Sequence, residues 1–554
     1  MNASARPAVR LHLIALLLAL FWGVLVQAPH LFLHRAFVNL DFTVHYNYAR
    51  ETFVAMQAGD FWPHFAFQAQ DGLGEPGLLY YAPLYYMLTW ALAQATGTVW
   101  TAMQGVEVLS AGALGYFSWR LAAGWGDPRR ALAAVPLAVL APMGCLLHLS
   151  FNGYPWASAL GPLAMLTWAT LRPEAQGRVL NLPAILALTL TVATHTVTGL
   201  MAVILLGALG LAELLRGRLA ALRTASLWAP ALTGAAGLLL SAAYLLPGYG
   251  SQDLIDASVW RQNYTPYNAF SLSTVTAWVF GVRWFAFQWP VSLVAFALAA
   301  MPLALAWRTL GDPAGRWFRA GAACAVGVIL FLATELSYPL WLIDSPLRNI
   351  QFPHRLITVL VPLGAALVPI GWERCRVRAP RAVLAAVALA SVGLGGLVVA
   401  KAAISDGAVI DVAERTFLPY PGLAEYRTRA ALDRGNRANA FDFRAECAQA
   451  GVTCSEGLRQ GRGMVWHLSS PRPARLRLPV YCFPAWSLGV NGAPAAARCD
   501  DRLGLVEMAV PAGRAQVALQ WQDLPLQRLG KEISAAVALL LVVAALAMRF
   551  RDQR

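Results

Sequence analysis

Long apolar runs separated by short polar segments recur along almost the whole chain. An α-helix rises about 1.5 Å per residue, so about 20 apolar residues cross a hydrocarbon core of ~30 Å. The pattern therefore predicts a polytopic membrane protein, mainly α, with about twelve transmembrane helices in a bundle. The predicted spans are residues 11–28, 102–121, 132–147, 156–171, 180–194, 197–215, 226–246, 289–307, 318–334, 356–372, 382–400 and 532–549.

Composition supports this class. Of the 554 residues, 58% are hydrophobic and only 13% are charged, and the mean hydropathy is +0.52. Such values lie outside the range of soluble globular domains.

The arginines indicate which loops lie in the cytoplasm. If the N-terminus is cytoplasmic, the short cytoplasmic loops contain Arg129, Arg130, Arg172, Arg178, Arg216, Arg218, Arg223, Arg308, Arg316, Arg374, Arg376, Arg378 and Arg381. Short loops are where the positive-inside rule applies best. Twelve spans return the C-terminus, which is also rich in arginine, to the cytoplasm. The net charge of +14 is thus a topology signal rather than a sign of a nucleic-acid partner.

One apolar stretch, Leu78 to Ala95, would invert every later loop if it crossed the membrane. It contains Pro83 and four tyrosines, a composition typical of the membrane–water boundary. We predict a helix on the outer surface, within a first external loop of residues 29–101. The first span could instead be a signal peptide, because Val26 to Ala28 resembles a cleavage site, but its apolar region is longer than most signal cores.

Residues 401–531 form the second large soluble segment, and they are predicted to lie outside as well. The second half contains short β-type runs broken by Asn491-Gly492, Pro511 and Gly513, which predict an antiparallel sheet or a small sandwich. The first half, from Val412 to Leu432, has a more helical pattern. The predicted division is a membrane module (1–400), a periplasmic β-containing domain (401–531), and a last span with a cytoplasmic tail (532–554).

Four of the seven cysteines fall in this external domain: Cys447, Cys454, Cys482 and Cys499. An even number in an exterior domain favours disulfides and an oxidising periplasm. Three pairings are open, and proximity in sequence favours Cys447–Cys454 and Cys482–Cys499. A zinc site is the alternative, but no CxxC pair or suitable histidine spacing accompanies these cysteines.

Three stretches of the chain resemble the C-type (GT-C) membrane glycosyltransferases, in particular the YfhO-type branch and its "6-pyruvoyl-tetrahydropterin synthase-related" membrane relatives. The first is the first external loop, with Asp41, His45, Gly59-Asp60, Pro63, DGLGEP (71–76) and YYAPLYY (80–86). The second is IQFPHR (350–355), where the family usually has a tryptophan before the arginine. The third is the ending from Phe483 to Ser534.

The resemblance implies transfer of a sugar from a polyprenyl-phosphate donor to an envelope glycan, lipid or protein at the periplasmic face of a bacterial inner membrane. It makes Asp41 the general base, since a carboxylate within hydrogen-bond reach can take the proton of an attacking hydroxyl. The alternative is that Asp41 only caps a helix. His45, four residues on, would share its helix face and could orient the base or bind substrate.

Other candidates would bind substrate. Asp71 and Glu75 could contact a sugar or support a turn. Tyr80, Tyr81, Tyr85 and Tyr86 suit sugar rings or an isoprenoid chain, or act as interfacial anchors. Arg355, with Arg348 and His354 nearby, could bind the donor phosphate, although an ion pair to Asp344 is equally compatible. His195 would reach the same face.

The next external loop, HLSFNGYPW (148–156), contains no acid, whereas many C-type enzymes have an acidic motif there. We therefore predict no essential metal and no cofactor. No Gly-rich phosphate loop is present, which argues against a nucleotide-sugar donor. A lipid-linked glycan transporter or flippase is an alternative, although the spans have few ionisable groups near the midplane. A non-catalytic assembly protein is a third interpretation.

Overall fold

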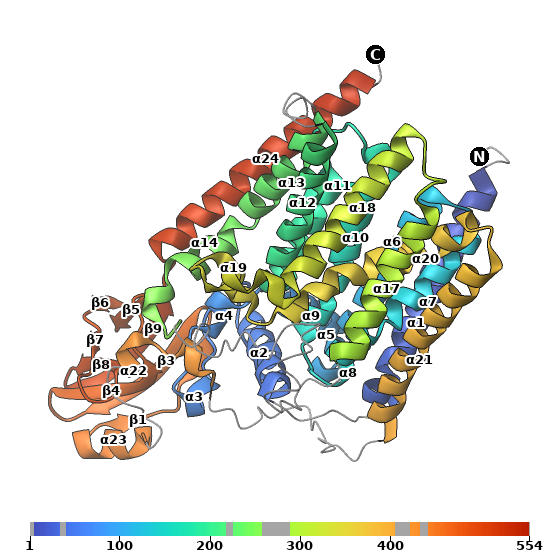
Figure 1. Ribbon diagram of the computed structural model, residues 1–554. Coiled ribbons are helices and arrows are strands. Elements are labelled where there is room, and N and C mark those ends of the chain that lie inside the picture. The colour runs from blue at the N-terminus through green and yellow to red at the C-terminus, as the bar shows by residue number, and fades with distance from the viewer. Residues whose placement is uncertain are drawn as a thin grey trace.

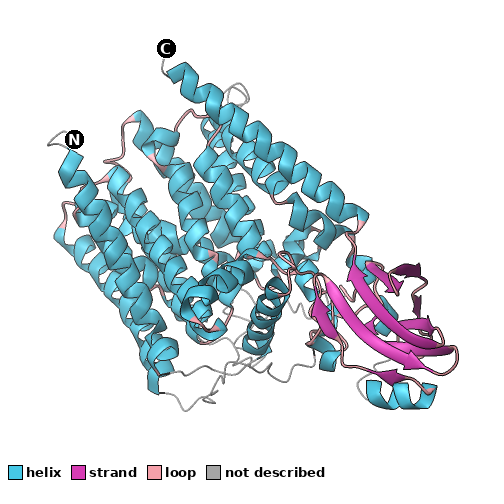
Figure 2. Ribbon diagram, turned by 180° about the vertical axis from the view of Figure 1, so that it is seen from behind, coloured by secondary structure: helices cyan, strands magenta, loops and turns pink. Residues whose placement is uncertain are grey.

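The structure is a computed structural model that describes residues 5–33, 40–217, 225–257, 288–404, 422–432 and 441–552. A bundle of long helices is joined at one end to a smaller β-rich part (Figures 1 and 2). Both chain ends lie at the opposite end of the bundle from the strands (Figure 1). The bundle helices are α1 (Ala5–Phe32), α6 (Val99–Trp125), α7 (Ala134–Val139), α8 (Pro142–Leu149), α9 (Tyr154–Ser158), α10 (Leu160–Leu171), α11 (Leu182–Thr194), α12 (Thr196–Gly217), α13 (Ala225–Leu240), α14 (Ala242–Gly250), α17 (Gln288–Ala306), α18 (Pro313–Leu332), α20 (Leu360–Arg374), α21 (Arg378–Ile404) and α24 (Pro525–Asp552).

Every predicted span overlaps one or more of these helices. Among the described residues, seven helices are long and apolar enough to cross a membrane, and an eighth span results if the bent pair α13–α14 is counted as one. Two further apolar helices, α11 and the Val291–Ala306 part of α17, are shorter. The structure is thus that of a multi-pass membrane protein, while the count of twelve stays a prediction.

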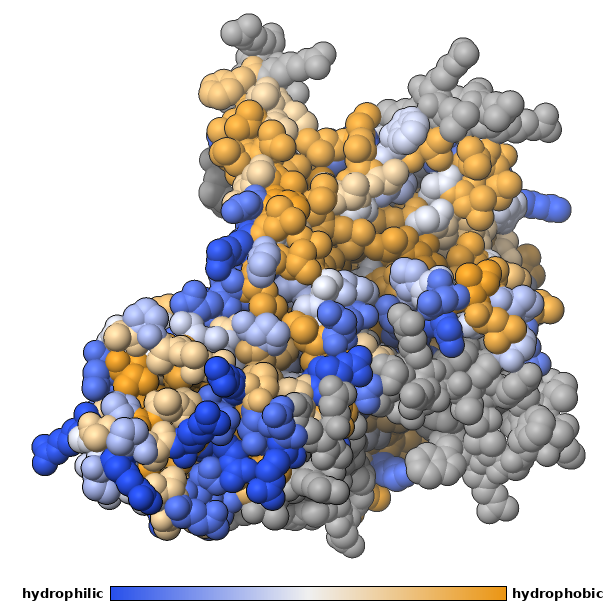
Figure 3. Space-filling model, turned by 90° about the vertical axis from the view of Figure 1, so that its left-hand side faces the viewer, coloured by the Kyte–Doolittle hydropathy of each residue, from blue (hydrophilic) through white to orange (hydrophobic). Residues whose placement is uncertain are grey.

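Lipid-facing surface is recognisable on the outer helices. Residues of α24, including Leu539, Leu540 and Val543, are more than half exposed, although each is strongly apolar. Figure 3 shows hydrophobic residues covering the bundle and hydrophilic ones gathered at the end with the strands. An apolar surface of this extent is expected where hydrocarbon replaces water as the solvent.

The predicted span 226–246 is not straight. The chain bends by 76° between the helical segments Leu227–Leu240 and Ala242–Gly250. Beyond the bend, α14 packs on α24, where Gly530 allows a close approach because a Cβ there would lie 2.4 Å from the carbonyl oxygen of Ala242. The bend turns Tyr244 and Tyr249 toward the cavity described below.

The segment predicted to be the first external loop, called the first loop below, is folded against the end of the bundle. It contains α2 (Leu40–Gln57), α3 (Ala69–Gly72), α4 (Gly77–Tyr80) and α5 (Leu84–Thr96). The surface helix expected over residues 78–95 is therefore two helices, because Tyr81 is extended and Pro83 precedes α5. Gly97 ends α5 in the left-handed conformation, with φ of 77°, as is common at helix C-termini. Thr98 then caps α6 by accepting a hydrogen bond from the Thr101 amide.

Antiparallel strands follow in the last quarter of the chain. Their bounds are β1 (Thr453–Cys454), β2 (Leu458–Gln460), β3 (Gly463–Ser470), β4 (Ala474–Tyr481), β5 (Trp486–Val490), β6 (Ala493–Ala495), β7 (Arg498–Cys499), β8 (Leu505–Val510) and β9 (Gly513–Trp521). One sheet has the order β1-β3-β9-β5-β6, with β2 also paired to β3, and the other has the order β4-β8-β7. Asn491 and Gly492, with φ of 52° and 80°, make the predicted turn between β5 and β6.

Small helices flank the sheets: α22 (Arg429–Leu432), α23 (Phe443–Ala450) and the 3₁₀ turn η10 (Ala424–Tyr426). The predicted helical pattern over residues 412–432 lies outside the described residues up to 421. The predicted disulfide pairs, Cys447–Cys454 and Cys482–Cys499, are both formed. The zinc alternative for these cysteines is therefore wrong.

The first loop and the sheets share one hydrophobic core. Phe65 and Phe67 of the loop pack against Trp486, with ring centroids 4.9 and 5.6 Å apart. Side chains of both sheets, such as Leu478 and Val517, belong to the same cluster. Residues 65–67, which belong to the predicted membrane module, thus pack with the strands, and the predicted domain boundaries stay a prediction.

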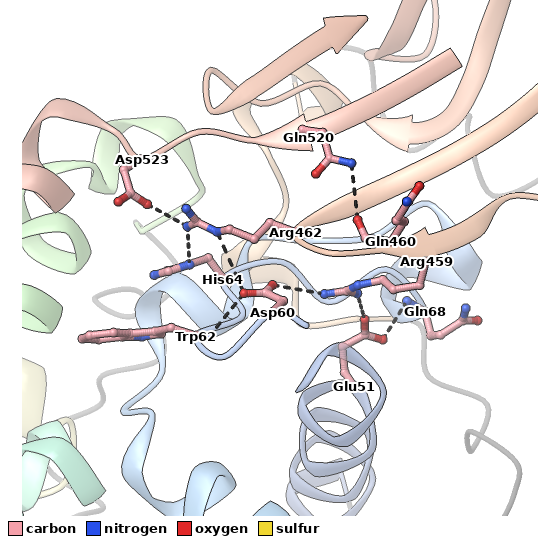
Figure 4. Close-up of polar contacts among 10 residues, drawn as sticks. All are labelled: Glu51, Asp60, Trp62, His64, Gln68, Arg459, Gln460, Arg462, Gln520 and Asp523. Carbon is pink, nitrogen blue, oxygen red and sulfur yellow. Dashed lines mark hydrogen bonds and ion pairs between the residues drawn. The ribbon is translucent and has the colours of Figure 1, made fainter. Parts of the chain in front are cut away.

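Ion pairs link the same two segments (Figure 4). Arg459 of β2 lies 2.5 Å from Glu51 of α2 and 3.5 Å from Asp60, and these three side chains are at most 10% exposed. Arg462 lies 2.7 Å from Asp523 and donates to Nδ1 of His64 at 3.3 Å. We call this cluster the junction. It joins the sheets to α2, the helix that carries Asp41.

Candidate functional site

A cavity of about 370 Å³ opens between the end of the bundle, the first loop and η10. Its walls come from α2, the segment from α4 to Ala82, the start of α9, the start of α12, α14, the segment before α20, and Leu423, Glu425 and Tyr426. Six predicted site residues line it: Asp41, His45, Tyr80, Tyr81, His195 and Arg355. They are up to 314 residues apart in sequence (355 minus 41), and the fold brings them to one place.

Asp41 lies in the first turn of α2. The side chain is accessible to solvent and lines the cavity, whose walls partly desolvate the carboxylate. Burial raises the pKa of Asp41 above its ordinary value, and the positive charge of Arg355 opposes that increase. The first turn of a helix also favours a carboxylate electrostatically. A raised pKa suits a group that must accept a proton near neutral pH.

His45 is one helical turn further along α2 and is buried. Its Nδ1 lies 2.8 Å from the hydroxyl of Tyr86, and its ring meets that of Tyr81 edge-on at 5.5 Å. Burial lowers the pKa of His45 to about 3. The imidazole is therefore neutral at physiological pH, so it can orient neighbouring groups but does not supply a positive charge.

Tyrosine rings form much of one wall. The Tyr80 hydroxyl donates to the carbonyl oxygen of Ser251 at 2.7 Å, and the Tyr244 hydroxyl donates to the carbonyl oxygen of Tyr80 at 2.7 Å. Tyr80 stacks on Tyr426, with centroids 5.9 Å apart and planes 18° from parallel. Tyr85 and Tyr86 are instead fully buried and do not line the cavity. Of the four predicted tyrosines, only Tyr80 and Tyr81 are therefore placed to touch a ligand.

Arg355 brings a positive charge into the cavity from the 3₁₀ turn η9 (Pro353–Val359). Its guanidinium lies over the ring of Trp156 at 4.9 Å and over that of Phe352 at 4.8 Å. One terminal nitrogen donates to the carbonyl oxygen of Ile350 and to Gln351, both at 3.2 Å. No carboxylate forms an ion pair with Arg355 among the described residues. The charge thus stays available to an anionic ligand.

His195 lies between the last residue of α11, Thr194, and the first residue of α12, Thr196. Its Nδ1 accepts a hydrogen bond from the backbone N–H of Thr198 at 3.2 Å and also contacts the hydroxyl of Thr198 at 2.7 Å. Its ring also stacks on Trp156, 6.1 Å away. His195 therefore has a structural role as a cap in addition to lining the cavity.

Four predicted candidates lie outside the cavity. Glu75 is fully buried and accepts hydrogen bonds from Tyr48, Gln70 and the Leu423 amide. Arg348 lies 4.0 Å from Asp344, so the ion pair considered for this region belongs to Arg348. His354 is buried, and Asp71 is exposed in the left-handed conformation next to Gly72. Glu75 thus has partners within the protein, and the substrate-binding roles of all four residues stay predictions.

The cavity also contains residues that the sequence patterns do not single out. These are Trp156, Tyr244, Tyr249, Gln351, Glu425 and Tyr426. Glu425 matters most because it is the second carboxylate of the cavity wall. The only hint in the sequence is its setting in LPYPGLAEY (418–426), a run rich in proline and tyrosine like YYAPLYY in the first loop.

No group of three or more His, Cys, Asp or Glu side chains suited to a metal ion occurs in the described part of the chain. Independence from metal stays a prediction.

No family model and no curated protein matches the sequence. The YfhO-type branch therefore stays a prediction.

The solved structures that partly match the chain include two proteins of low sequence identity. The crystal structure of ArnT from Cupriavidus metallidurans bound to undecaprenyl phosphate has a TM-score of 0.42 and 15% identity, covering 68% of this chain and 61% of that one. The cryo-EM structure of the arabinosyltransferase EmbB from Mycobacterium smegmatis has a TM-score of 0.36 and 13% identity, covering 95% of this chain and 64% of that one. The matched regions cover less than two thirds of ArnT and less than two thirds of EmbB. At these TM-scores and identities, neither structure assigns a residue role to this chain.

Proposed function

We propose that this protein is a membrane glycosyltransferase that moves a sugar from a polyprenyl-phosphate donor to a hydroxyl group of an envelope acceptor. The observation that carries the proposal is the meeting of Asp41, Arg355 and several tyrosine rings in one cavity at the end of a membrane bundle. A carboxylate, a guanidinium and aromatic faces are the groups that such a reaction requires.

In the proposed reaction, the acceptor oxygen attacks the anomeric carbon and forms the new glycosidic bond. The bond from that carbon to the phosphate oxygen breaks, and polyprenyl phosphate leaves with the electron pair. Asp41 takes the proton of the attacking hydroxyl, while Arg355 stabilises the charge that develops on the leaving phosphate. Attack from the side opposite the phosphate inverts the configuration of the sugar. The chemistry needs no cofactor.

Substitution of Arg355 tests whether the cavity binds the phosphate of the donor. Arg355→Ala removes a charged hydrogen-bond donor, which is worth about 1.5–3 kcal/mol, so affinity for undecaprenyl phosphate should fall roughly 10- to 100-fold. The matched control is Arg348→Ala, because Arg348 is also close to the bundle end but lies outside the cavity and contacts Asp344. Binding is measured by native mass spectrometry of the purified protein in detergent.

Transfer is measured in the same preparations, with radiolabelled polyprenyl-phosphate sugars as donors and membranes from a strain lacking the protein as acceptor. Wild type and the Arg348 variant should transfer label, and the Arg355 variant should not at low donor concentration. Equal binding by both variants would remove Arg355 from the donor site. Binding without any transfer by wild type would favour a lipid-linked glycan transporter or a non-catalytic assembly protein.

We also propose that the cavity faces the periplasm and that both chain ends are cytoplasmic. The position of both ends opposite the sheets supports this orientation (Figure 1). Single cysteines at two exposed positions test it, Ala493→Cys in β6 and Gln176→Cys in the loop between α10 and α11. A membrane-impermeant maleimide applied to spheroplasts should label the first and not the second. The reverse pattern would invert the topology.

A further inference from the structure

A segment from the soluble part of the chain completes the cavity. Residues 422–428, which we call the strap, contribute Leu423, Glu425 and Tyr426 to its wall. The strap contains the 3₁₀ turn η10, closed by a hydrogen bond from the Tyr426 amide to the carbonyl oxygen of Leu423 at 3.0 Å. The position of the strap therefore determines which part of a ligand in the cavity Glu425 can contact.

The first loop holds the beginning of the strap. The Leu423 amide donates to Glu75 at 3.2 Å, and the Gln70 side-chain amide donates to the carbonyl oxygen of Leu423 at 3.3 Å. Gly422 has a φ of +80°, and a Cβ at this position would lie 1.9 Å from Nε2 of Gln70. Any other residue would be strained by the positive φ and would displace the Gln70 and Glu75 side chains. The buried Glu75 thus holds the beginning of the strap through the Leu423 amide.

The end of the strap is held as well. Tyr426 stacks on Tyr80, and its ring also meets that of Tyr81 at 5.6 Å. Thr428 forms an antiparallel bridge with Ile255, next to the 3₁₀ turn η4 (Gln252–Leu254) after α14. Fixed at both ends, the strap presents Glu425 to the cavity from the side of the tyrosine wall.

Charge separates the roles of the two carboxylates. Asp41, Arg355 and Glu425 all line the cavity, and the positive charge of Arg355 acts on Asp41. Burial raises the pKa of Glu425, and the negative charges of Asp41 and Asp256 raise it further. A second anion is an unfavourable neighbour for an anionic donor. It is a favourable partner for hydroxyl groups, which donate hydrogen bonds to carboxylates.

We propose that Glu425 binds the acceptor, accepting hydrogen bonds from hydroxyl groups of a sugar whose apolar face lies against Tyr80 and Tyr426. This inference rests on the proposed function and names the acceptor class, a carbohydrate with more than one hydroxyl group. Asp41 then takes the proton of the attacking hydroxyl, and Glu425 orients the same acceptor sugar so that this hydroxyl faces the donor. Tyrosine faces beside a carboxylate are well suited to a sugar ring.

The test uses Glu425→Gln, which keeps the size of the side chain, in the transfer assay described above. The apparent KM for acceptor membranes should rise roughly tenfold to a hundredfold. The reason is that the carboxylate of residue 425, a charged hydrogen-bond acceptor, is replaced by a neutral amide. Affinity for undecaprenyl phosphate should stay equal or increase, which also shows that the variant is folded. The matched control is Glu456→Gln, an exposed carboxylate of the same soluble part that pairs with Arg444.

Three results would overturn the proposal. An unchanged acceptor KM in the Glu425 variant would remove Glu425 from the acceptor site. A large fall in kcat with unchanged KM would make Glu425 the base rather than an acceptor-binding residue. Absence of transfer by wild type would refute the proposed function and this inference with it. If wild type transfers sugar but the acceptor KM of the Glu425 variant is unchanged, only this inference fails.

Discussion

Replacing Asp41 by asparagine is expected to lower sugar transfer by roughly 10²–10⁴-fold, the usual contribution of a general base. Asparagine keeps the shape of the side chain but cannot take the proton of the attacking hydroxyl. Affinity for undecaprenyl phosphate should change little, because Arg355 supplies the positive charge. The loss of the carboxylate from the first turn of α2 should cost no more than about 0.3–1 kcal/mol of stability.

The control for Asp41 is Asp71→Asn, since Asp71 belongs to the same loop, is exposed and does not line the cavity. Its variant should transfer at the wild-type rate. The pH profile gives a second readout. Burial raises the pKa of Asp41 above the ordinary value, so the wild-type rate should decline as the pH falls through that raised pKa and the base becomes protonated. Near-wild-type transfer by Asp41→Asn would exclude it as the base.

Replacing Arg459 by methionine is expected to destabilise the junction by roughly 3–5 kcal/mol. The change leaves Glu51 and Asp60, whose side chains are 3% and 5% exposed, as buried carboxylates without their common partner. Glu51 lies ten residues beyond Asp41 on α2, about 15 Å along the helix. Hydrogen exchange measured by mass spectrometry should show easier opening of α2, and transfer should decrease with it.

Arg444→Met is the matched control for this change. Arg444 and Glu456 are 2.6 Å apart, nearly the same distance as Arg459 and Glu51, but their side chains are 84% and 80% exposed. Water compensates such charges, so the pair should be worth about 0–1 kcal/mol. If both variants cost the same, burial does not determine the strength of the junction. Unchanged exchange in α2 after Arg459→Met would show that the sheets do not hold this helix.

Long helices, tight turns and short-range pairings could be predicted because each depends on nearby residues. The apolar runs place helices at every predicted span, since the length of such a run is a local property. Asn491-Gly492 makes a hairpin turn because both residues tolerate positive φ. Cys447 and Cys454 are separated by only seven residues, which favours their pairing over more distant partners. Asp41 and Arg355 were recognisable from the short motifs around them.

Other features depended on contacts between distant segments. The bend at Ser241 turns two tyrosines into the cavity where an uninterrupted apolar run predicts a straight helix. Glu75 resembles a sugar ligand in its motif, but the Leu423 amide, 348 residues away, occupies one of its oxygens.

The amino-acid sequence by itself thus indicated the membrane class and the helix positions, favoured the disulfide pairs that form, and singled out Asp41 and Arg355 as candidates. The tertiary structure alone decided that these two residues share a cavity and that Glu425 joins them. The physical reason is that local structure follows from nearby residues, whereas a cavity wall is made of side chains whose positions depend on packing and buried hydrogen bonds across the whole chain.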